Sequence, residues 1–534
     1  MLRANTDPLF RLKKIETWTD EVGYQVPYYV VPRPSVEYTY TNGRRTVAKL
    51  ANESEWRYSY NDRGEVTGGN KYLPDGATRV SGMSFGYTFD AIGNRTSTTA
   101  GTESPARPPS TYIPNNLNQY ASRSTPAVAD VVGEADEDAT VTVTLGSNLP
   151  RTATRQEQYY HAKLDINRPE PNDPGGGRVF LPLSIRAVIN DPGPPPVDLQ
   201  DIKSGQIYLP EASELFEYDA DGNLTQDSRW DYEWDAENRL REMHTREEAA
   251  VAGAPRIKLG FQYDWLGRRT KKLHYSWNAV QEDYSETPWE IGFLYDGWNL
   301  LAEVSPSIPN PGSWEMGRRY TWGLDLSGTL DGAGGVGGLL ALSSGPASTA
   351  PLYTPAYDGN GNVIGLFCTL INQSNPEFVA SYEYGPFGEL IRSASFNGAL
   401  GGGAAAEYNP FRWSTQYSDS ETGLTYAKFR YYERTKGRWL SRDPINSLST
   451  RLLQTDTRPR RVRLREEMNL YRFVDNEPVS KYDPLGLQAG SQQLDARTQG
   501  HIRNLHPLLQ PMARAHIEAV NAALNSEYMQ ARSN

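Results

Sequence analysis

Two aspartates and one arginine near the C-terminal end carry the side chains that acid–base chemistry would need. Asp443 stands in Ser-Arg-Asp-Pro, Asp483 in Tyr-Asp-Pro-Leu-Gly-Leu, and Arg430 in Phe-Arg-Tyr-Tyr. Two carboxylates that share one proton provide both a base to activate water and an acid to protonate a departing amide nitrogen. A nearby guanidinium can hold one carboxylate ionised and stabilise charge on a carbonyl. In the simpler alternative, each Asp-Pro pair begins a turn and the arginine lies along a strand.

Three sequence blocks around these residues occur in a fixed order, at 426–445, 469–478 and 478–487. Together they closely resemble the RHS-repeat-associated core domain. That resemblance implies a self-cleaving, aspartyl-protease-like element that closes a β-strand shell, often with a toxin after the cut. Carried over by motif position, the catalytic residues are Arg430, Asp443 and Asp483. The cleaved bond lies between Leu487 and Gln488.

The spacing inside this core departs from the pattern of the family. Residues 446–467 stand where the family has a short Gly-rich loop, so Asp483 follows Asp443 by forty positions. The segment holds five arginines from Arg458 to Arg465. These arginines could bind a nucleic acid or an acidic cargo. A mixed Arg/Glu run is more typical of a solvated face, and we expect an outward loop because unpaired buried arginines are costly.

A short phrase recurs upstream, in which aromatic residues precede Asp and a Gly and Asn or Arg follow within a few residues. Alternating aromatic and polar residues predict strands with one dry face, and Asp-x-x-Gly-Asn supplies a side-chain acceptor and a residue that tolerates positive φ for a hairpin turn. The copies resemble YD repeats of the RHS family, whose stacked hairpins form a spiral, hollow shell. They lie at 85–96, 216–225, 232–240 and 261–270, with weaker copies near Tyr58, Tyr295, Tyr357 and Tyr384.

The phrase is absent between about residues 119 and 210, where Val and Thr alternate at 139–145 and apolar residues gather at 183–189. This pattern favours an inserted β-sandwich, and the alternative is a set of irregular repeats of the same shell. We therefore divide the chain into N-terminal repeats (1–118), an insert (119–210), a repeat shell (211–410), the core (411–487) and a variable tail (488–534). The fold class is mainly β.

Composition supports this fold class and limits the function. Thirty-three Tyr, 47 Gly and 37 Pro favour short strands joined by turns. A net charge of −11 predicts no nucleic-acid partner, and one cysteine, Cys368, excludes an intrachain disulfide. No signal peptide or apolar run long enough for a membrane span occurs, so any export needs a dedicated secretion system or a missing N-terminal part.

Two further patterns in the sequence do not predict a cofactor or a metal site. Gly332-Ala-Gly-Gly-Val-Gly337 fits a dinucleotide phosphate loop, yet it follows a Gly-rich connector and not a strand that enters a helix. His161, His244 and His274 are scattered, and lone histidines are seldom ligands. We expect no cofactor and no metal site.

The tail changes period, with apolar residues three and four apart from Leu509 to Leu524, which predicts an amphipathic helix at 510–525. Residues 494–515 resemble the opening helix of M15-type peptidases, and a generic helix is the alternative. No zinc-binding segment of that family follows, and His501, His506 and His516 do not replace it. The tail is too short for an ordinary enzyme core.

These observations predict an RHS-type shell protein that cleaves itself after Leu487 and releases or retains a C-terminal effector segment. Its expected partners are its own C-terminal segment as cargo and other shell or secretion-machine subunits. One alternative is a non-catalytic adhesion or carbohydrate-binding scaffold, since Tyr and Trp on the hairpins could stack on sugar rings. The other alternative is the degenerate remnant of a larger RHS toxin.

Overall fold

The computed structural model of the chain describes residues 2–6, 12–17, 24–26, 29–31, 34–101, 108–190, 198–307, 313–344, 350–369, 376–396, 404–444 and 469–487. In this part the fold is mainly β and antiparallel, as the sequence predicts. The short helices are α1 (Glu247–Val251), α2 (Ala405–Tyr408) and the 3-10 turns η2 (Trp413–Thr415) and η3 (Val474–Asn476).

The N-terminal half forms an 11-stranded sheet whose neighbours are almost all consecutive in the sequence. Such an order is that of stacked hairpins. Its strands, in spatial order, are β1 (Leu2–Thr6), β2 (Leu12–Thr17), β5 (Ser35–Thr41), β6 (Arg44–Leu50), β7 (Glu55–Tyr60), β8 (Val66–Tyr72), β9 (Arg79–Phe89), β10 (Arg95–Ala100), β11 (Ser110–Pro114), β12 (Tyr120–Ser124) and β20 (Ser213–Leu215).

A 14-stranded sheet continues the same pattern from residue 217 to residue 395. Its strands are β21 (Glu217–Tyr218), β22 (Leu224–Gln226), β23 (Trp230–Trp234), β24 (Leu240–Thr245), β25 (Lys258–Tyr263), β26 (Arg269–Tyr275), β29 (Trp289–Asp296), β30 (Asn299–Pro306), β31 (Trp314–Trp322), β32 (Leu339–Ser344), β33 (Leu352–Tyr357), β34 (Val363–Thr369), β35 (Glu377–Tyr384) and β36 (Leu390–Ser395).

Two small sheets lie between β12 and β20 in the sequence. One holds β13 (Val128–Glu134), β16 (Thr154–Gln156) and β17 (Tyr159–Asp165). The other holds β14 (Thr140–Leu145), β15 (Arg151–Thr152), β18 (Val179–Ile189) and β19 (Leu199–Leu209). They share a hydrophobic cluster of their own, which includes Val131, Val143 and Leu164. The domain boundaries drawn from the sequence stay a prediction.

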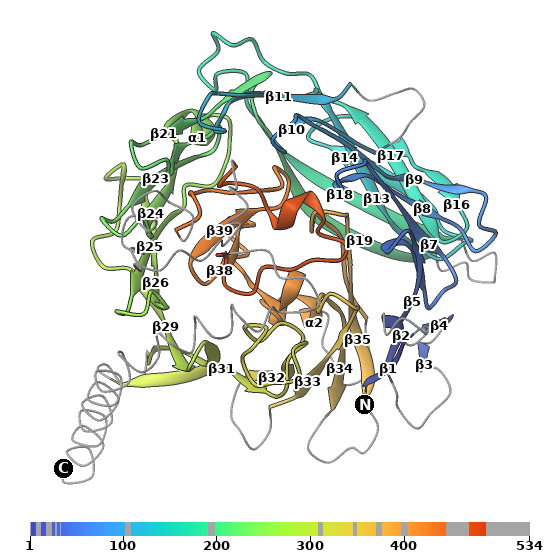
Figure 1. The fold of residues 1–534 in the computed structure, drawn as a ribbon. Coiled ribbons are helices and arrows are strands. Elements are labelled where there is room, and N and C mark those ends of the chain that lie inside the picture. Colours follow the sequence, from blue (N-terminus) through green and yellow to red (C-terminus); the bar gives the residue numbers. More distant parts are fainter. Residues whose placement is uncertain are drawn as a thin grey trace.

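The C-terminal sheet consists of β37 (Tyr417–Ser418), β38 (Thr425–Ala427), β39 (Arg430–Glu433) and β40 (Arg438–Trp439). Two hairpins complete the list, β3 (Tyr24–Val26) with β4 (Tyr29–Val31) and β27 (Trp277–Asn278) with β28 (Asp283–Tyr284). Figure 1 shows both large sheets curving around β38, β39 and the segment 469–487, drawn in orange and red. The C-terminal part of the described chain therefore lies inside the β shell.

The hairpin turns have the chemistry that the repeat phrase predicts. Asp219 Oδ1 accepts a hydrogen bond from Asn223 N at 2.8 Å, and Gly222 between them has φ +88°. Asp264 Oδ1 and Arg268 N form the same bond at 2.9 Å. In these copies each turn residue with positive φ is Gly or Asn. Glycine has no Cβ that would oppose this conformation, and asparagine tolerates it better than most residues that have a Cβ.

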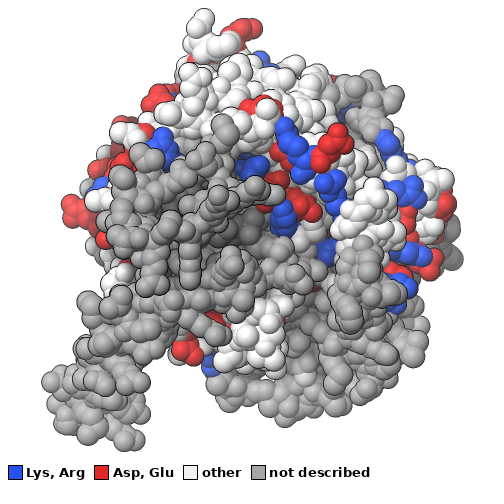
Figure 2. All heavy atoms as spheres, in the orientation of Figure 1, with Lys and Arg blue, Asp and Glu red and all other residues white. Residues whose placement is uncertain are grey.

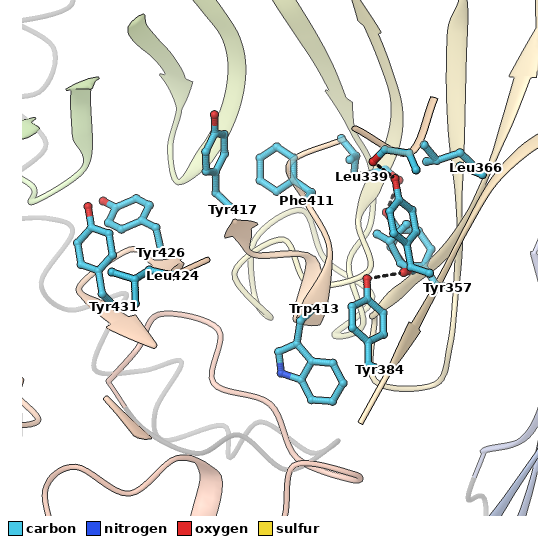
Figure 3. Close-up of a cluster of buried hydrophobic side chains, with 14 of the residues drawn as sticks. Leu339, Tyr357, Leu366, Tyr384, Phe411, Trp413, Tyr417, Leu424, Tyr426 and Tyr431 are labelled. Atoms are coloured by element: carbon cyan, nitrogen blue, oxygen red, sulfur yellow. Dashed lines mark hydrogen bonds between the residues drawn. The ribbon is translucent and has the colours of Figure 1, made fainter. Parts of the chain in front are cut away.

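In several copies the aromatic residue before the turn Asp also links one hairpin to the preceding one. The Tyr263 hydroxyl donates to Leu240 O at 2.7 Å, and the Trp234 indole N–H donates to Leu224 O at 2.7 Å. Figure 3 shows the equivalent bond from Tyr357 to Leu339 O, which is 2.5 Å long. Because the acceptor follows the previous turn, this bond fixes the stacking of the repeats. The sequence suggests only the apolar role of these rings.

One continuous hydrophobic core joins the large sheets to the C-terminal sheet. It runs from Val36 in the first sheet through Leu366 in the second to Tyr417 and Tyr431 in the C-terminal sheet. Figure 3 shows Phe411, Tyr417, Tyr426 and Tyr431 on the C-terminal side of this core. The inner side chains of the shell thus pack on the residues that carry the candidate site.

Candidate active site

The structure brings the three predicted catalytic residues into one buried cluster. Arg430 opens β39, Asp443 follows β40, and Asp483 lies in the last described segment. Arg430 Nη2 lies 3.3 Å from Asp443 Oδ2 and 3.3 Å from Asp483 Oδ2. The relative exposure of Arg430, Asp443 and Asp483 is 2%, 3% and 3%. One guanidinium therefore bridges two carboxylates away from water.

The two carboxylates of this cluster contact the same guanidinium nitrogen, each at 3.3 Å. Two carboxylates held at one cation in a buried site have the arrangement of an acid–base pair. A pair of carboxylates with one proton is the state that can act as base and acid together.

Asp483 also organises the turn that ends at the predicted cleavage site. Its Oδ1 accepts hydrogen bonds from Gly486 N at 2.9 Å and from Leu487 N at 3.0 Å. Gly486 has φ +72°, and a Cβ there would lie 2.6 Å from Ala427 O. The turn-forming role that the sequence suggests for Asp-Pro is therefore real for Asp483, and its other carboxylate oxygen contacts Arg430.

Arg430 binds the backbone of this turn as well as the carboxylates. Its Nε donates to Gly486 O, and its Nη1 donates to Leu470 O at 3.2 Å. The guanidinium carbon stacks 4.2 Å from the ring centroid of Trp439. The positive charge is thus fixed at the residue that precedes Leu487.

Repeat turns from distant parts of the shell hold the segment 469–487 in place. Asn469 Nδ2 donates to Asn94 Oδ1 at 2.8 Å, and the Tyr471 hydroxyl donates to Gly222 O at 2.7 Å. Arg45 Nη1 donates to Val479 O at 2.7 Å. These contacts come from both large sheets, so the position of Asp483 depends on the folded shell.

Buried ion pairs anchor the C-terminal sheet to the shell. Arg269 Nη1 lies 2.7 Å from Asp419 Oδ2, and Lys272 Nζ lies 3.1 Å from Asp419 Oδ1. On another side, Lys436 Nζ lies 3.0 Å from Asp227 Oδ2. Removing one partner of such a pair leaves a buried charge uncompensated. Arg430 and Asp443 therefore stand on an element that cannot shift easily.

The remaining sequence predictions fall at different places. Leu487 is half-buried, whereas Gln488, the insertion 446–467 and the tail 488–534 lie outside the described residues. His161 Nε2 lies 2.8 Å from Asp130 Oδ1, and His244 Nε2 lies 3.6 Å from Asp231 Oδ2, both far from Asp483 in the sequence. Among the described residues, no group of His, Cys, Asp and Glu side chains could hold a metal ion, and no helix is long and apolar enough to cross a membrane.

The sequence reasoning missed two neighbours of the site. The Gly-rich stretch at 332–337 packs against Pro484, and the ammonium of Lys428 contacts Gly334 O in this stretch. The run of glycines was the available signal, since dense Gly also marks a close approach of backbones. Figure 2 shows acidic and basic side chains intermixed over the described surface in this view.

Comparison with known proteins connects the chain to toxins. No known family model matches the chain. It is 25% identical to the tRNA3(Ser)-specific nuclease WapA of Bacillus spizizenii over 273 residues, which make up 51% of this chain and 9% of that protein. It is 26% identical to double-stranded DNA deaminase toxin A of Burkholderia cenocepacia over 287 residues, which make up 52% of this chain and 17% of the toxin.

One solved structure aligns with most of the chain. The crystal structure of TcdB2-TccC3-Cdc42 aligns with 91% of this chain and 20% of that chain, at a TM-score of 0.36 and 17% identity. The relatives of the chain are toxin-related proteins, and the chain spans a small part of their length.

Proposed function

We propose that the chain is a toxin-associated RHS shell protein that cleaves itself between Leu487 and Gln488 by an aspartyl-protease-like mechanism. The observation that carries the proposal is the buried contact of one guanidinium with two carboxylates, at the turn that ends at Leu487. The toxin-related relatives and the β shell support the class of protein.

The proposed reaction is the hydrolysis of one peptide bond. One carboxylate of the Asp443–Asp483 pair takes a proton from water, and the water oxygen forms a bond to the Leu487 carbonyl carbon. The other carboxyl gives its proton to Gln488 nitrogen as the C–N bond breaks. Arg430 stabilises the charge that develops, since it already lies at the Gly486 carbonyl. The products are a Leu487 carboxylate and a Gln488 amine.

The expected partners follow from this reaction and are part of the proposal. The segment 488–534 is the cargo that the shell releases or retains, and other shell or secretion-machine subunits complete the assembly.

Intact mass measurement of the purified protein under denaturing conditions tests the proposal. Self-cleavage yields a body that ends at Leu487 and a fragment that begins at Gln488, and denaturation reveals the fragment even if it stays bound. A folded sample that remains one intact species after prolonged incubation at mild pH excludes self-cleavage. Breakage between Asp483 and Pro484 instead reports acid lability of that bond, and the masses of the products distinguish the two.

A further inference from the structure

The Gly-rich loop between β31 and β32 lies directly against the segment that carries Asp483. Ala333 and Val336 of this loop form a fully buried cluster with Tyr482. A Cβ on Gly334 would lie 2.8 Å from Pro484 O and 2.8 Å from Lys428 Nζ. The loop thus touches both chain neighbours of Asp483, and only glycine fits at residue 334.

The loop has a fixed shape of its own. Asp325 Oδ2 accepts hydrogen bonds from Ala333 N at 2.6 Å and from Gly335 N at 3.1 Å. Thr415 Oγ1 accepts a hydrogen bond from Gly337 N at 2.8 Å. A side-chain acceptor at each end holds the glycines, so the loop presents Gly334 O in one direction.

Lys428 joins this loop to the hairpin that carries Arg430. It occupies the turn between β38 and β39 with φ +63°, a conformation that costs about 1 kcal/mol for a residue with a Cβ. Its partly buried ammonium donates a hydrogen bond to Gly334 O. Burial lowers the pKa of Lys428 to about 8, although Asp325, Asp331 and Asp483 oppose the shift. A strained, desolvated lysine that binds a carbonyl beside the site indicates a selected role.

We propose that Lys428 is a positioning residue of the site, which clamps the Gly-rich loop onto Pro484 and so holds Asp483 against Arg430. The inference rests on the proposed self-cleavage for its functional meaning, but the clamp itself is a property of the uncleaved chain. Two hydrogen bonds to backbone carbonyls complete the clamp: the Gln416 side-chain Nε2 donates to Pro484 O at 3.3 Å, and Phe429 N donates to Leu485 O at 3.1 Å.

The first experiment measures the clamp without cleavage. In the Asp443→Asn background, Lys428→Met should raise the hydrogen-exchange rates of the Gly486 and Leu487 amides about fivefold or more, because Asp483 loses its support. Lys481→Met is the control, since Lys481 pairs with Asp475 and Glu477 in the same segment. Unchanged exchange in Lys428→Met overturns the proposal, whether or not the native chain cleaves itself.

A second variant reaches the same contact from the opposite side. Gly334→Ala should reproduce the exchange change, because its methyl group would meet both Lys428 and Pro484. Gly328→Ala is the matched control: Gly328 has φ +75° in the same loop, and its added Cβ meets no atom within 4 Å. Equal effects of the two alanines would show that backbone strain, and not the clamp, is responsible, and would overturn the proposal.

The final experiment uses the rate of cleavage. Lys428→Met should slow cleavage about tenfold or more, since a small misplacement of a catalytic group is costly. Lys428→Arg should restore most of the rate. The Lys428→Arg variant should also lose the part of the pH dependence of the cleavage rate that lies near pH 8, where Lys428 loses its charge beside Asp325, Asp331 and Asp483. If Lys428→Met cleaves at the native rate, the clamp does not serve the site. If the native chain fails to cleave, the proposed function falls and the exchange result still decides the clamp.

Discussion

Arg430 Nη2 and Asp483 Oδ2 lie 3.3 Å apart, although 53 positions separate the two residues in the sequence. The same nitrogen contacts Asp443, so the guanidinium joins the end of β40 to the last turn of the described chain. This contact turns three scattered residues into a candidate site. It also links the site to the shell, because the repeat turns hold the segment that carries Asp483.

We predict that Asp443→Asn and Asp483→Asn each abolish self-cleavage while the fold stays nearly unchanged. The amide keeps the shape of the carboxyl group but cannot share its proton. Intact mass measures cleavage and circular dichroism measures the fold. Asp475→Asn is the control, because Asp475 pairs with Arg472 and Lys481 in the same segment. Cleavage at the native rate in either site variant would show that the pair is wrongly assigned.

We predict that Arg430→Ala stops cleavage and lowers the free energy of unfolding by about 3–5 kcal/mol, because two buried carboxylates lose their counter-charge. Arg430→Lys should destabilise the chain less, since it keeps the charge and loses the fork of donors. Mass measurement and chemical denaturation separate the two effects. Normal cleavage in the alanine variant would remove Arg430 from the mechanism.

We predict that a short Gly-rich linker can replace residues 446–467 with cleavage preserved. Arginines buried unpaired beside the carboxylate pair would carry a large desolvation cost, so this segment should bulge outward. The residues lie outside the described part of the chain. Loss of cleavage in a folded deletion variant would instead make Arg460, Arg461 or Arg463 candidates for the charge-stabilising role given to Arg430.

We predict that Tyr384→Phe lowers the free energy of unfolding by about 1 kcal/mol, because the buried hydroxyl donates to Val363 O at 2.8 Å. Figure 3 shows this bond between hairpins. Tyr353→Phe is the comparison, since the Tyr353 hydroxyl makes no hydrogen bond within the described residues. Equal changes in chemical denaturation would mean that the bond between repeats contributes nothing specific.

We predict that acid weakens the attachment of the C-terminal sheet to the shell. Burial alone would raise the pKa of the Asp419 carboxyl, but the charges of Arg269 and Lys272 outweigh burial and hold its pKa below the ordinary value. A carboxyl group whose pKa is lowered in the folded chain stabilises the fold at pH values above about 3.9, the pKa of the group in the unfolded chain. This stabilisation is lost as the pH falls further. Thermal unfolding should show a smaller acid-dependent loss in Asp419→Asn. The same acid dependence in both chains would contradict the assignment.

The sequence by itself determined the mainly β fold and the hairpin turns, and the resemblance of three motifs to the RHS-repeat-associated core named the candidate residues. The fold and the turns follow from local chemistry: Asp219 and Gly222 satisfy one turn within five residues, and alternating aromatics define one dry face. Local signals of this kind need no knowledge of distant contacts. The cleavage after Leu487 is still a prediction, as are the roles that the family resemblance gives to Arg430, Asp443 and Asp483.

Only the tertiary structure decided that Arg430, Asp443 and Asp483 meet, because the curvature of two sheets sets the distance between residues far apart in the chain. The same holds for the hydroxyl of Tyr263, which finds Leu240 O only when hairpins stack. It holds also for Lys428 and Gly334, whose contact depends on a turn and a loop 94 positions apart. Such contacts depend on packing geometry, which residue type and spacing do not encode locally.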